Sequence, residues 1–371
     1  MAIPTNSKIR ARDLGIPFDG KPGPLNAITD VAGVEVGFTT IIEGEGALTI
    51  GQGPIRTGVT VIHPRGKARA FEPVWAGYHS LNGNGEMTGL LWIDEGGAFS
   101  GPIAITNTHS VGMAHHGLIK WMIQHPEFNN EKNLWMLPVA AETCDEYLND
   151  INGQHIDESH VIAACDTATS GPVNEGNVGG GTGMICYEFK GGTGTSSRTC
   201  SINGKSYTTG VLVQANFGTR NDLSVRGVPV GHHLTNNTLW KTPVHPNVQG
   251  SIIAIAITDA PLLPIQMQRI AKRIGMGIAR TGTPGEDGSG DIFLALSTGN
   301  DVCETAKEAN PSINYIPNQE LDPLFLATVE ATEEAIINAL VAARTLSGQN
   351  DHTAHAVNHD DLMDVMKKYS R

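Results

Sequence analysis

The sequence predicts an α+β protein in which short strands are combined with a few helices. Its 44 glycines and 20 prolines separate apolar, β-branched runs, which is the pattern of strands joined by turns. Longer stretches after Asp259 and at residues 321–346 instead repeat apolar residues at helical spacing, the second as a long amphipathic helix. Both kinds of element therefore contribute to the fold.

The N-terminal third of the chain consists mainly of short predicted strands. Apolar alternation predicts strands within residues 26–40 and at residues 58–63 and 101–106. The last of these ends in a polar run, Asn107-Thr108-His109-Ser110. A helix is predicted at residues 117–125.

An acidic cluster follows a predicted buried strand at residues 137–141. It begins with Glu142 and continues through Asp145, Glu146 and Asp150. Carboxylates at the exit of a core strand can bind a cation, although acids in a loop are more often only solvated. Glu142 therefore becomes a candidate cation-binding residue only if another observation points to the same place.

A glycine-rich region at residues 176–198 raises the question of a phosphate-binding loop. No G-x-G-x-x-G motif leads from a strand into a helix there, and Gly204-Lys205-Ser206 lacks the earlier glycine of a P-loop because position 199 is Thr199. We expect a strand at residues 184–189, with glycines before and after it. The pattern excludes a nucleotide site and indicates closely packed backbone.

The dipeptide Asn203-Gly204 predicts a hairpin between residues 198–202 and 205–214. Asn216 follows at the end of the second strand. Its amide can donate a hydrogen bond to an oxyanion, or it can merely cap a turn. The long polar connection after it, residues 219–246, is a natural place for a cleavable loop.

The most informative stretch is residues 246–258, in which Gly250-Ser251 opens an uninterrupted apolar run. The run predicts a strand buried on both faces, with Ser251 at its mouth. The glycine allows its own carbonyl to approach the serine hydroxyl, a geometry that suits attack of Ser251 on the preceding peptide bond. Cleavage would leave an α-amino group with a pKa near ~8 beside the hydroxyl, where it can act as base. The same pattern also occurs where a small residue simply begins a strand.

Ser289 and Asp291 stand at the start of another predicted strand, after the helix that follows Asp259. Their i and i+2 spacing lets both side chains face the same way, so a hydroxyl–carboxylate relay toward Ser251 is conceivable. Serine and aspartate are also ordinary turn residues.

Metal chemistry has weak support in the sequence. His352, His355 and His359 lie at i, i+3 and i+7 near the C-terminus, without a strand or fixed loop to hold them, and we expect surface histidines. Neither H-E-x-x-H nor G-x-S-x-G occurs.

Composition limits the partners. A net charge of -13 argues against nucleic acid or an anionic membrane and is compatible with cationic substrates. The five cysteines are odd in number and form no C-x-x-C pair, which predicts neither a disulfide framework nor a zinc knuckle. Residues 1–13 contain no apolar leader and no run reaches membrane-spanning length, so we expect a cytoplasmic protein.

Nearly the whole chain resembles the DmpA-type family of self-cleaving aminopeptidases, which includes L-aminopeptidase D-Ala-esterase/amidases and β-peptidyl aminopeptidases. The shared landmarks are RARDLGIPFDG, NAITDVAGVEVG, TGVTVIHPRGKA, NGNGEMTG, ITNTHS, LPVAAET, GNVGGGTGMICYEFKGGTGTSSR, VQANFG, GSIIAIAITDAP and GSGD.

The resemblance implies one domain over residues 1–371, cut between Gly250 and Ser251 into an α chain of residues 1–250 and a β chain of residues 251–371. It also implies a four-layer αββα sandwich like that of N-terminal-nucleophile (Ntn) hydrolases but with different connectivity. Family members form oligomers, commonly tetramers, so a homotetramer of αβ units is expected.

The resemblance also assigns roles to residues. Ser251 matches the family's nucleophile, and Ser289 with Asp291 matches its serine–acid partners. Asn216 matches an asparagine that stabilises the oxyanion, and Glu142 matches an acid that binds the substrate amine.

Two positions depart from the pattern of relatives. Cys144 stands where several relatives have an aromatic residue, often Tyr, and Tyr147 lies three positions further on. Asp291 replaces the Glu of some relatives with a shorter side chain. The preference for L, D or β residues therefore stays open.

The resulting hypothesis is a serine aminopeptidase that releases N-terminal residues from short peptides, amides or esters with a free amine, with no metal or organic cofactor. An acyltransferase of the ornithine acetyltransferase type is one alternative, although such proteins cleave before Thr. A non-enzymatic scaffold with a degenerate site is the other.

Overall fold

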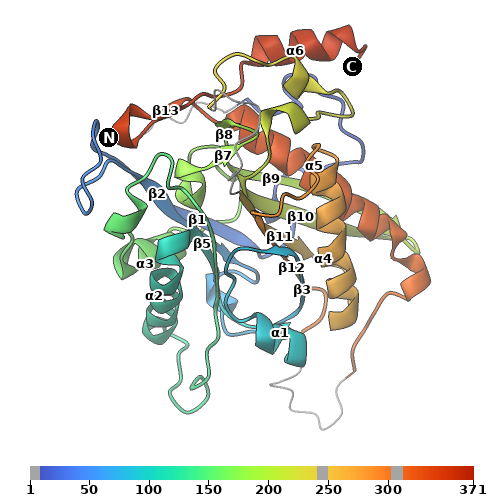
Figure 1. Cartoon of the computed structure of the whole chain (residues 1–371). Coiled ribbons are helices and arrows are strands. Elements are labelled where there is room, and N and C mark those ends of the chain that lie inside the picture. The colour runs from blue at the N-terminus through green and yellow to red at the C-terminus, as the bar shows by residue number, and fades with distance from the viewer. Residues whose placement is uncertain (1–8, 240–249, 302–311) are drawn as a thin grey trace.

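Two mixed sheets packed face to face form the centre of the molecule, and helices cover both outer faces (Figure 1). The computed structural model describes residues 9–239, 250–301 and 312–371. One apolar cluster lies between the sheets, and two others lie between a sheet and its helices. The described chain is therefore the αββα sandwich that was predicted.

The larger sheet has the strand order β4-β3-β12-β11-β10-β9. The β11 and β12 strands are parallel, whereas β9-β10, β10-β11, β3-β4 and β3-β12 are antiparallel pairs. Its strands are β3 Val74–Gly83, β4 Ala98–Phe99, β9 Gly192–Ile202, β10 Lys205–Asn216, β11 Ser251–Thr258 and β12 Gly290–Ser297.

The β9-β10 hairpin confirms the turn predicted from Asn203-Gly204. Both residues have positive φ angles, 51° and 78°, and Ile202 pairs directly with Lys205. A two-residue turn with this geometry matches the twist of the strands it joins. Its second strand carries the chain to Asn216.

The β11 strand is buried on both faces, as predicted. Alternate residues from Ile252 to Ala256 pack in the cluster beneath the helices, and alternate residues from Ile253 to Ile257 pack between the sheets. This arrangement explains the unbroken apolar run, because a strand in the middle of a sandwich has no solvent face.

The smaller sheet has the strand order β1-β2-β5-β6, with β5 and β6 parallel. Helices α2 and α3 cover its outer face. Its strands are β1 Glu35–Glu43, β2 Ile55–His63, β5 Ile103–Asn107 and β6 Val139–Thr143, and the two helices are α2 Val111–Gln124 and α3 Glu158–Asp166.

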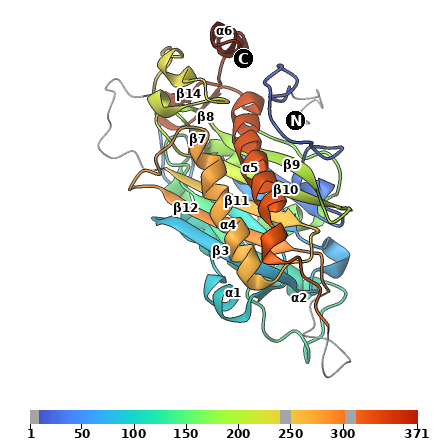
Figure 2. The ribbon, with the colours of Figure 1, turned by 90° about the vertical axis from the view of Figure 1, so that its right-hand side faces the viewer.

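Helices α4 Pro264–Ala279 and α5 Asp322–Ala342 lie side by side over the larger sheet (Figure 2). The prediction of an amphipathic helix at residues 321–346 is wrong in its length and its character. Every residue from Ala327 to Ala342 is buried, because the helix packs on β9 and β10 and also against α4. Smaller elements are α1 Leu90–Gly96, β13 Leu346–Ser347, β14 Thr353–Ala354 and α6 His359–Lys368.

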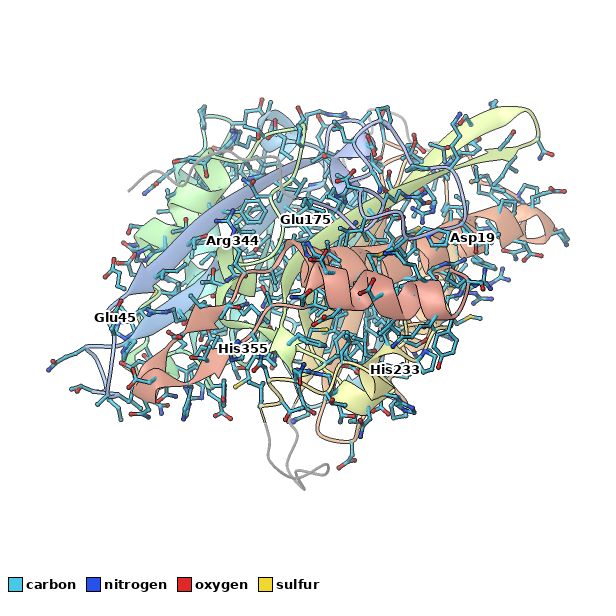
Figure 3. All side chains as sticks on the ribbon, turned by 90° about the horizontal axis from the view of Figure 1, so that it is seen from above. Asp19, Glu45, Glu175, His233, Arg344 and His355 are labelled. Atoms are coloured by element: carbon cyan, nitrogen blue, oxygen red, sulfur yellow. The ribbon has the colours of Figure 1, made fainter. Side chains whose placement is uncertain are left out.

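Arginines from other segments neutralise the acids of α5. Arg198 and Arg12 both pair with the buried Glu334, at 2.7 and 2.9 Å. Arg10, from the same N-terminal segment as Arg12, pairs at 2.7 Å with Glu175, which Figure 3 labels in the view from above. A carboxylate can stay charged in the interior only with such partners, so the N-terminal segment helps the helix to remain buried.

The strand predicted at residues 184–189 is instead a minimal hairpin, β7 Ile185–Cys186 and β8 Phe189–Lys190. Tyr187 and Glu188 have φ angles of 51° and 57°, which reverse the chain. The N–H of Tyr187 donates to the Phe217 carbonyl at 2.7 Å. The hairpin is thereby attached just beyond the end of β10, beside the candidate site.

No helix among the described residues is both long and apolar enough to cross a membrane.

Candidate active site

Ser251 is the first residue of β11, in the middle of the larger sheet. It pairs with Asn216 of β10 on one side and with Gly290 of β12 on the other. Its side chain is buried, with 3% of the residue exposed, and its Oγ has no hydrogen-bond partner among the described residues. A buried hydroxyl without a partner is costly, so this position favours a reactive role over a structural one.

The residue before it, Gly250, is held closely by its neighbours. Its carbonyl accepts a hydrogen bond from the Gly290 N–H at 3.1 Å. A Cβ at Gly250 would lie 3.0 Å from the Phe217 Cα, so a larger residue would disturb the backbone. The peptide that precedes Ser251 is therefore both confined and polarised.

Asn216 faces Ser251 across the antiparallel pair, and such cross-strand neighbours lie on the same face of a sheet. Its Oδ1 accepts the Ile185 N–H at 2.8 Å, and its Nδ2 donates to the Cys144 carbonyl at 2.9 Å. These two contacts orient the amide and leave one Nδ2 hydrogen for another acceptor.

Ser289 and Asp291 are in contact, as their spacing predicts. The Ser289 hydroxyl donates to Asp291 Oδ1 at 2.6 Å, and the Asn82 amide approaches the other carboxylate oxygen at 3.3 Å. Burial raises the pKa of Asp291, while the Ser289 hydroxyl, the Asn82 amide and the Ile252 N–H lower it. The last contact places the carboxyl beside the residue that follows Ser251.

Glu142 lies near the end of β6, where the smaller sheet approaches this edge of the larger one. Its carboxylate accepts hydrogen bonds from the Glu86 N–H at 2.8 Å and from the Thr108 hydroxyl. Burial raises its pKa, and both hydrogen bonds oppose that shift. A Cβ at Gly85 would lie 3.2 Å from Glu142 Oε1 and 3.3 Å from the Gly290 Cα, so only a glycine separates the carboxylate from β12.

No Lys or Arg pairs with Glu142 within the described ranges. A carboxylate that is 3% exposed and has no Lys or Arg partner among the described residues is electrostatically incomplete. It can be completed by a positive charge brought by a ligand.

Cys144 stands where the family resemblance leads us to expect an aromatic residue. Its carbonyl orients Asn216, while burial raises the pKa of its thiol to about 12. Tyr147 stacks its ring on His352 of the C-terminal segment, with 4.6 Å between ring centroids. Position 144 therefore presents a small neutral side chain.

Two side chains that support the site were not among the predicted site residues. Thr108 donates to Glu142, and Asn82 donates to both Asp291 and the Glu286 carbonyl. Thr108 belongs to the polar run noted at the end of a predicted strand, which was the available signal. Nothing in the local sequence distinguishes Asn82 from a turn residue.

Asp150 of the acidic cluster and His359 of the C-terminal histidines have partners of their own. Asp150 contacts His155 at 2.9 Å, and His359 contacts the Val341 carbonyl at 2.9 Å. In the described part of the chain no group of three His, Cys, Asp or Glu side chains is arranged to hold a metal ion.

Residues 26–354 match the sequence profile of Peptidase family S58. The chain belongs to peptidase family S58. This S58 peptidase is 51% identical to the beta-peptidyl aminopeptidase BapA of Sphingosinicella microcystinivorans over 375 residues, which cover 98% of this chain and 93% of the relative.

Solved structures agree with that assignment. The L-aminopeptidase D-Ala-esterase/amidase of Ochrobactrum anthropi, described as a prototype of the serine aminopeptidases and a new variant among the Ntn hydrolase fold, superimposes with a TM-score of 0.91. It is 47% identical, and the match covers 98% of this chain and 99% of that one. A Burkholderia sp. beta-aminopeptidase gives a TM-score of 0.86 at 45% identity, covering 97% and 99%.

The resemblance found in the sequence is thus confirmed, as is the Ntn-type fold. The S58 peptidase is a hydrolase with aminopeptidase function. The assignment favours hydrolysis over the acyltransferase and scaffold alternatives.

Proposed function

We propose that this S58 peptidase releases N-terminal residues from short peptides, amides and esters through an acyl-enzyme on Ser251. The observation that carries the proposal is the Ser251 hydroxyl, which has no hydrogen-bond partner among the described residues and faces the oriented amide of Asn216. Glu142, a buried carboxylate that no Lys or Arg of the described ranges pairs with, lies close to the same strand ends.

The same serine first processes its own chain. Its Oγ attacks the Gly250 carbonyl, whose oxygen receives the Gly290 N–H, and the peptide nitrogen leaves as the new α-amino group. Water then hydrolyses the ester between Gly250 and the Ser251 Oγ. The products are an α chain of residues 1–250 and a β chain of residues 251–371.

In turnover, Ser251 Oγ attacks the substrate carbonyl while its proton passes to its own amino group or to the Ser289–Asp291 pair. The free Nδ2 hydrogen of Asn216 stabilises the oxyanion. Collapse expels the leaving amine or alcohol, which takes that proton, and water hydrolyses the acyl-enzyme. The chemistry requires only these side chains, the α-amino group of Ser251 and water.

Glu142 explains why the enzyme acts at N-termini. A substrate ammonium would pair with this buried carboxylate and fix the distance between the first residue's amine and the reacting carbonyl. Because relatives are described as beta-peptidyl aminopeptidases and as an L-aminopeptidase D-Ala-esterase/amidase, we propose that the substrate range includes L, D and β residues.

Intact mass under denaturing conditions tests the proposal. Wild-type protein should give two fragments that end and begin at Gly250 and Ser251, while Ser251→Ala should stay whole and lose amide turnover by more than about 1,000-fold. A Ser297→Ala variant, altered at the far end of β12, should process and turn over normally. Unchanged turnover in Ser251→Ala would exclude the mechanism.

We also propose that αβ units assemble into a cytoplasmic homotetramer. Light scattering of the processed enzyme measures the assembly, and cell fractionation measures the location. A monodisperse αβ monomer, or enzyme recovered outside the cytoplasm, would contradict the respective part.

A further inference from the structure

Lys190 is a fully buried lysine that the proposed mechanism does not use. It lies on β8, in the small hairpin labelled β7 and β8 in Figure 1, whose backbone is bonded to Phe217 just beyond the end of β10. Its Nζ donates to the carbonyls of Gly181, Met184 and Gly191, at 3.2, 2.8 and 2.9 Å. An ammonium has three hydrogens, so these carbonyls use all of its donors.

One of these carbonyls leads directly to the active site. The Met184 carbonyl and the Ile185 N–H belong to one peptide group. Its oxygen receives the Lys190 ammonium at 2.8 Å, and its N–H donates to Asn216 Oδ1 at 2.8 Å. A continuous chain of hydrogen bonds therefore runs from Lys190 through a peptide group to the amide that faces Ser251.

Each bond in such a chain polarises the next. A cation on the peptide oxygen makes the Ile185 N–H a stronger donor, and that donor makes the Asn216 amide a stronger donor through Nδ2. The direction of polarisation is the one that stabilises a developing negative charge.

Lys190 supplies donors to three carbonyls, but burial of its charge is costly. Burial lowers the pKa of Lys190 to about 7, with the carboxyl of Asp145 and the thiol of Cys186 as the titratable groups that act on it. Burial also raises the pKa of Asp145 to about 7. An apolar side chain of the same length would avoid the cost of burying the charge.

The backbone of Lys190 is anchored independently of its side chain. Its N–H donates to the carbonyl of His355, a residue labelled in Figure 3, at 2.7 Å. A change of side chain therefore leaves one attachment of the hairpin in place.

We propose that Lys190 is a positioning residue that orients and polarises Asn216 for oxyanion stabilisation. The inference rests on the proposed function, because it requires Asn216 to contact the oxyanion. The catalytic rate would then depend on a residue that does not contact the substrate.

The test compares Lys190→Met, which keeps the length without the ammonium, with Thr182→Val. Thr182 is equally buried in the same glycine-rich segment and donates to the Gly179 carbonyl at 2.6 Å, but it has no bond to the 184–185 peptide. Turnover of an amino-acid amide is normalised to the processed chain, measured by intact mass. We expect Lys190→Met to lower kcat about tenfold with KM within about twofold, and Thr182→Val to stay within about twofold in both.

A double-mutant cycle distinguishes an effect of Lys190 that acts through Asn216 from a general loss of structure. Asn216→Ala should lower kcat about 100-fold, and Lys190→Met added to it should lower kcat less than about twofold further, because the path through Asn216 is already cut. Lys190→Gln repeats the cycle if Lys190→Met yields no folded protein.

Two results would overturn the inference while leaving the proposed function intact. One is an unchanged kcat in Lys190→Met, and the other is an equal loss with and without Asn216. A normal kcat in Asn216→Ala would instead remove the proposed role of Asn216, and the inference with it.

Discussion

Asn216 and Ser251 face each other across the antiparallel β10-β11 pair, yet their side chains differ in hydrogen bonding. The amide is held by two backbone partners, whereas the hydroxyl has none among the described residues. A fixed donor beside a free nucleophile is the arrangement that acyl transfer requires, because the donor needs no reorganisation as charge develops.

Glu142→Gln should weaken recognition of the substrate amine. We expect kcat/KM for an amino-acid amide to fall about 100-fold, mainly through KM, because a charge-assisted hydrogen bond contributes about 1.5–3 kcal/mol. Glu86→Gln is the matched control, since it removes a nearby exposed carboxylate and keeps the backbone N–H that donates to Glu142. Equal losses in the two variants would contradict a specific role for Glu142.

The stability of the substrate-free enzyme should fall as pH rises through the titration of Glu142. Burial raises the pKa of this carboxyl in the folded state above its value in the unfolded chain. The folded state therefore binds the proton more tightly, and the resulting stabilisation is present at low pH and lost as pH rises through the folded pKa. Tm measured across acidic pH should decline less in Glu142→Gln than in wild type; parallel curves would contradict the prediction.

Thr108→Val should move the acidic limb of the kcat/KM profile to higher pH. The Thr108 hydroxyl lowers the pKa of Glu142 against the effect of burial, so its removal makes the carboxylate harder to ionise. The ionised form is the one that binds an ammonium. Profiles of kcat/KM against pH for wild type and Thr108→Val measure the shift. An acidic limb at the same pH in both would show that Thr108 does not affect amine binding.

Ser289→Ala should impair catalysis more than it impairs stability. We expect kcat to fall about 10–100-fold, since the buried Asp291 loses its 2.6 Å donor and the proton path is interrupted. Ser297→Ala removes a bond of the same length, to the Ala260 carbonyl, at the other end of β12. The two variants should lose about 1 kcal/mol of unfolding free energy each, but only the first should lose activity. Equal activities would show that Ser289 is merely structural.

Arg198→Met should destabilise the helix layer. Arg198 and Glu334 are both buried and paired, so removal of the arginine should cost about 3 kcal/mol of unfolding free energy. Arg12 pairs with the same carboxylate but is 30% exposed, and Arg12→Met should cost about 1 kcal/mol or less. Chemical denaturation of both variants measures the difference, and the opposite ranking would refute the argument.

Elements that local pattern specifies could be predicted from the sequence. An apolar run bounded by Gly250 predicts a strand buried on both faces, and Asn203-Gly204 predicts the β9-β10 hairpin, because both signals depend on neighbouring residues alone. The family landmarks also selected Ser251, Asn216, Glu142, Ser289 and Asp291, although they did so through resemblance and without geometry.

Features that depend on partners distant in the chain were seen only in the folded structure. The helix α5 is buried from Ala327 to Ala342 because it packs on β9, β10 and α4, and Arg12 and Arg198 neutralise its buried Glu334. Helical periodicity does not report such distant partners. The segment at residues 184–189 turns back on itself because its backbone binds Phe217 and Lys190 rather than a neighbouring strand. Local propensity is a sum over adjacent residues, whereas desolvation and hydrogen bonding are set by whatever the fold brings near. That is why the connection from Lys190 to Asn216 was visible only once the chain had folded.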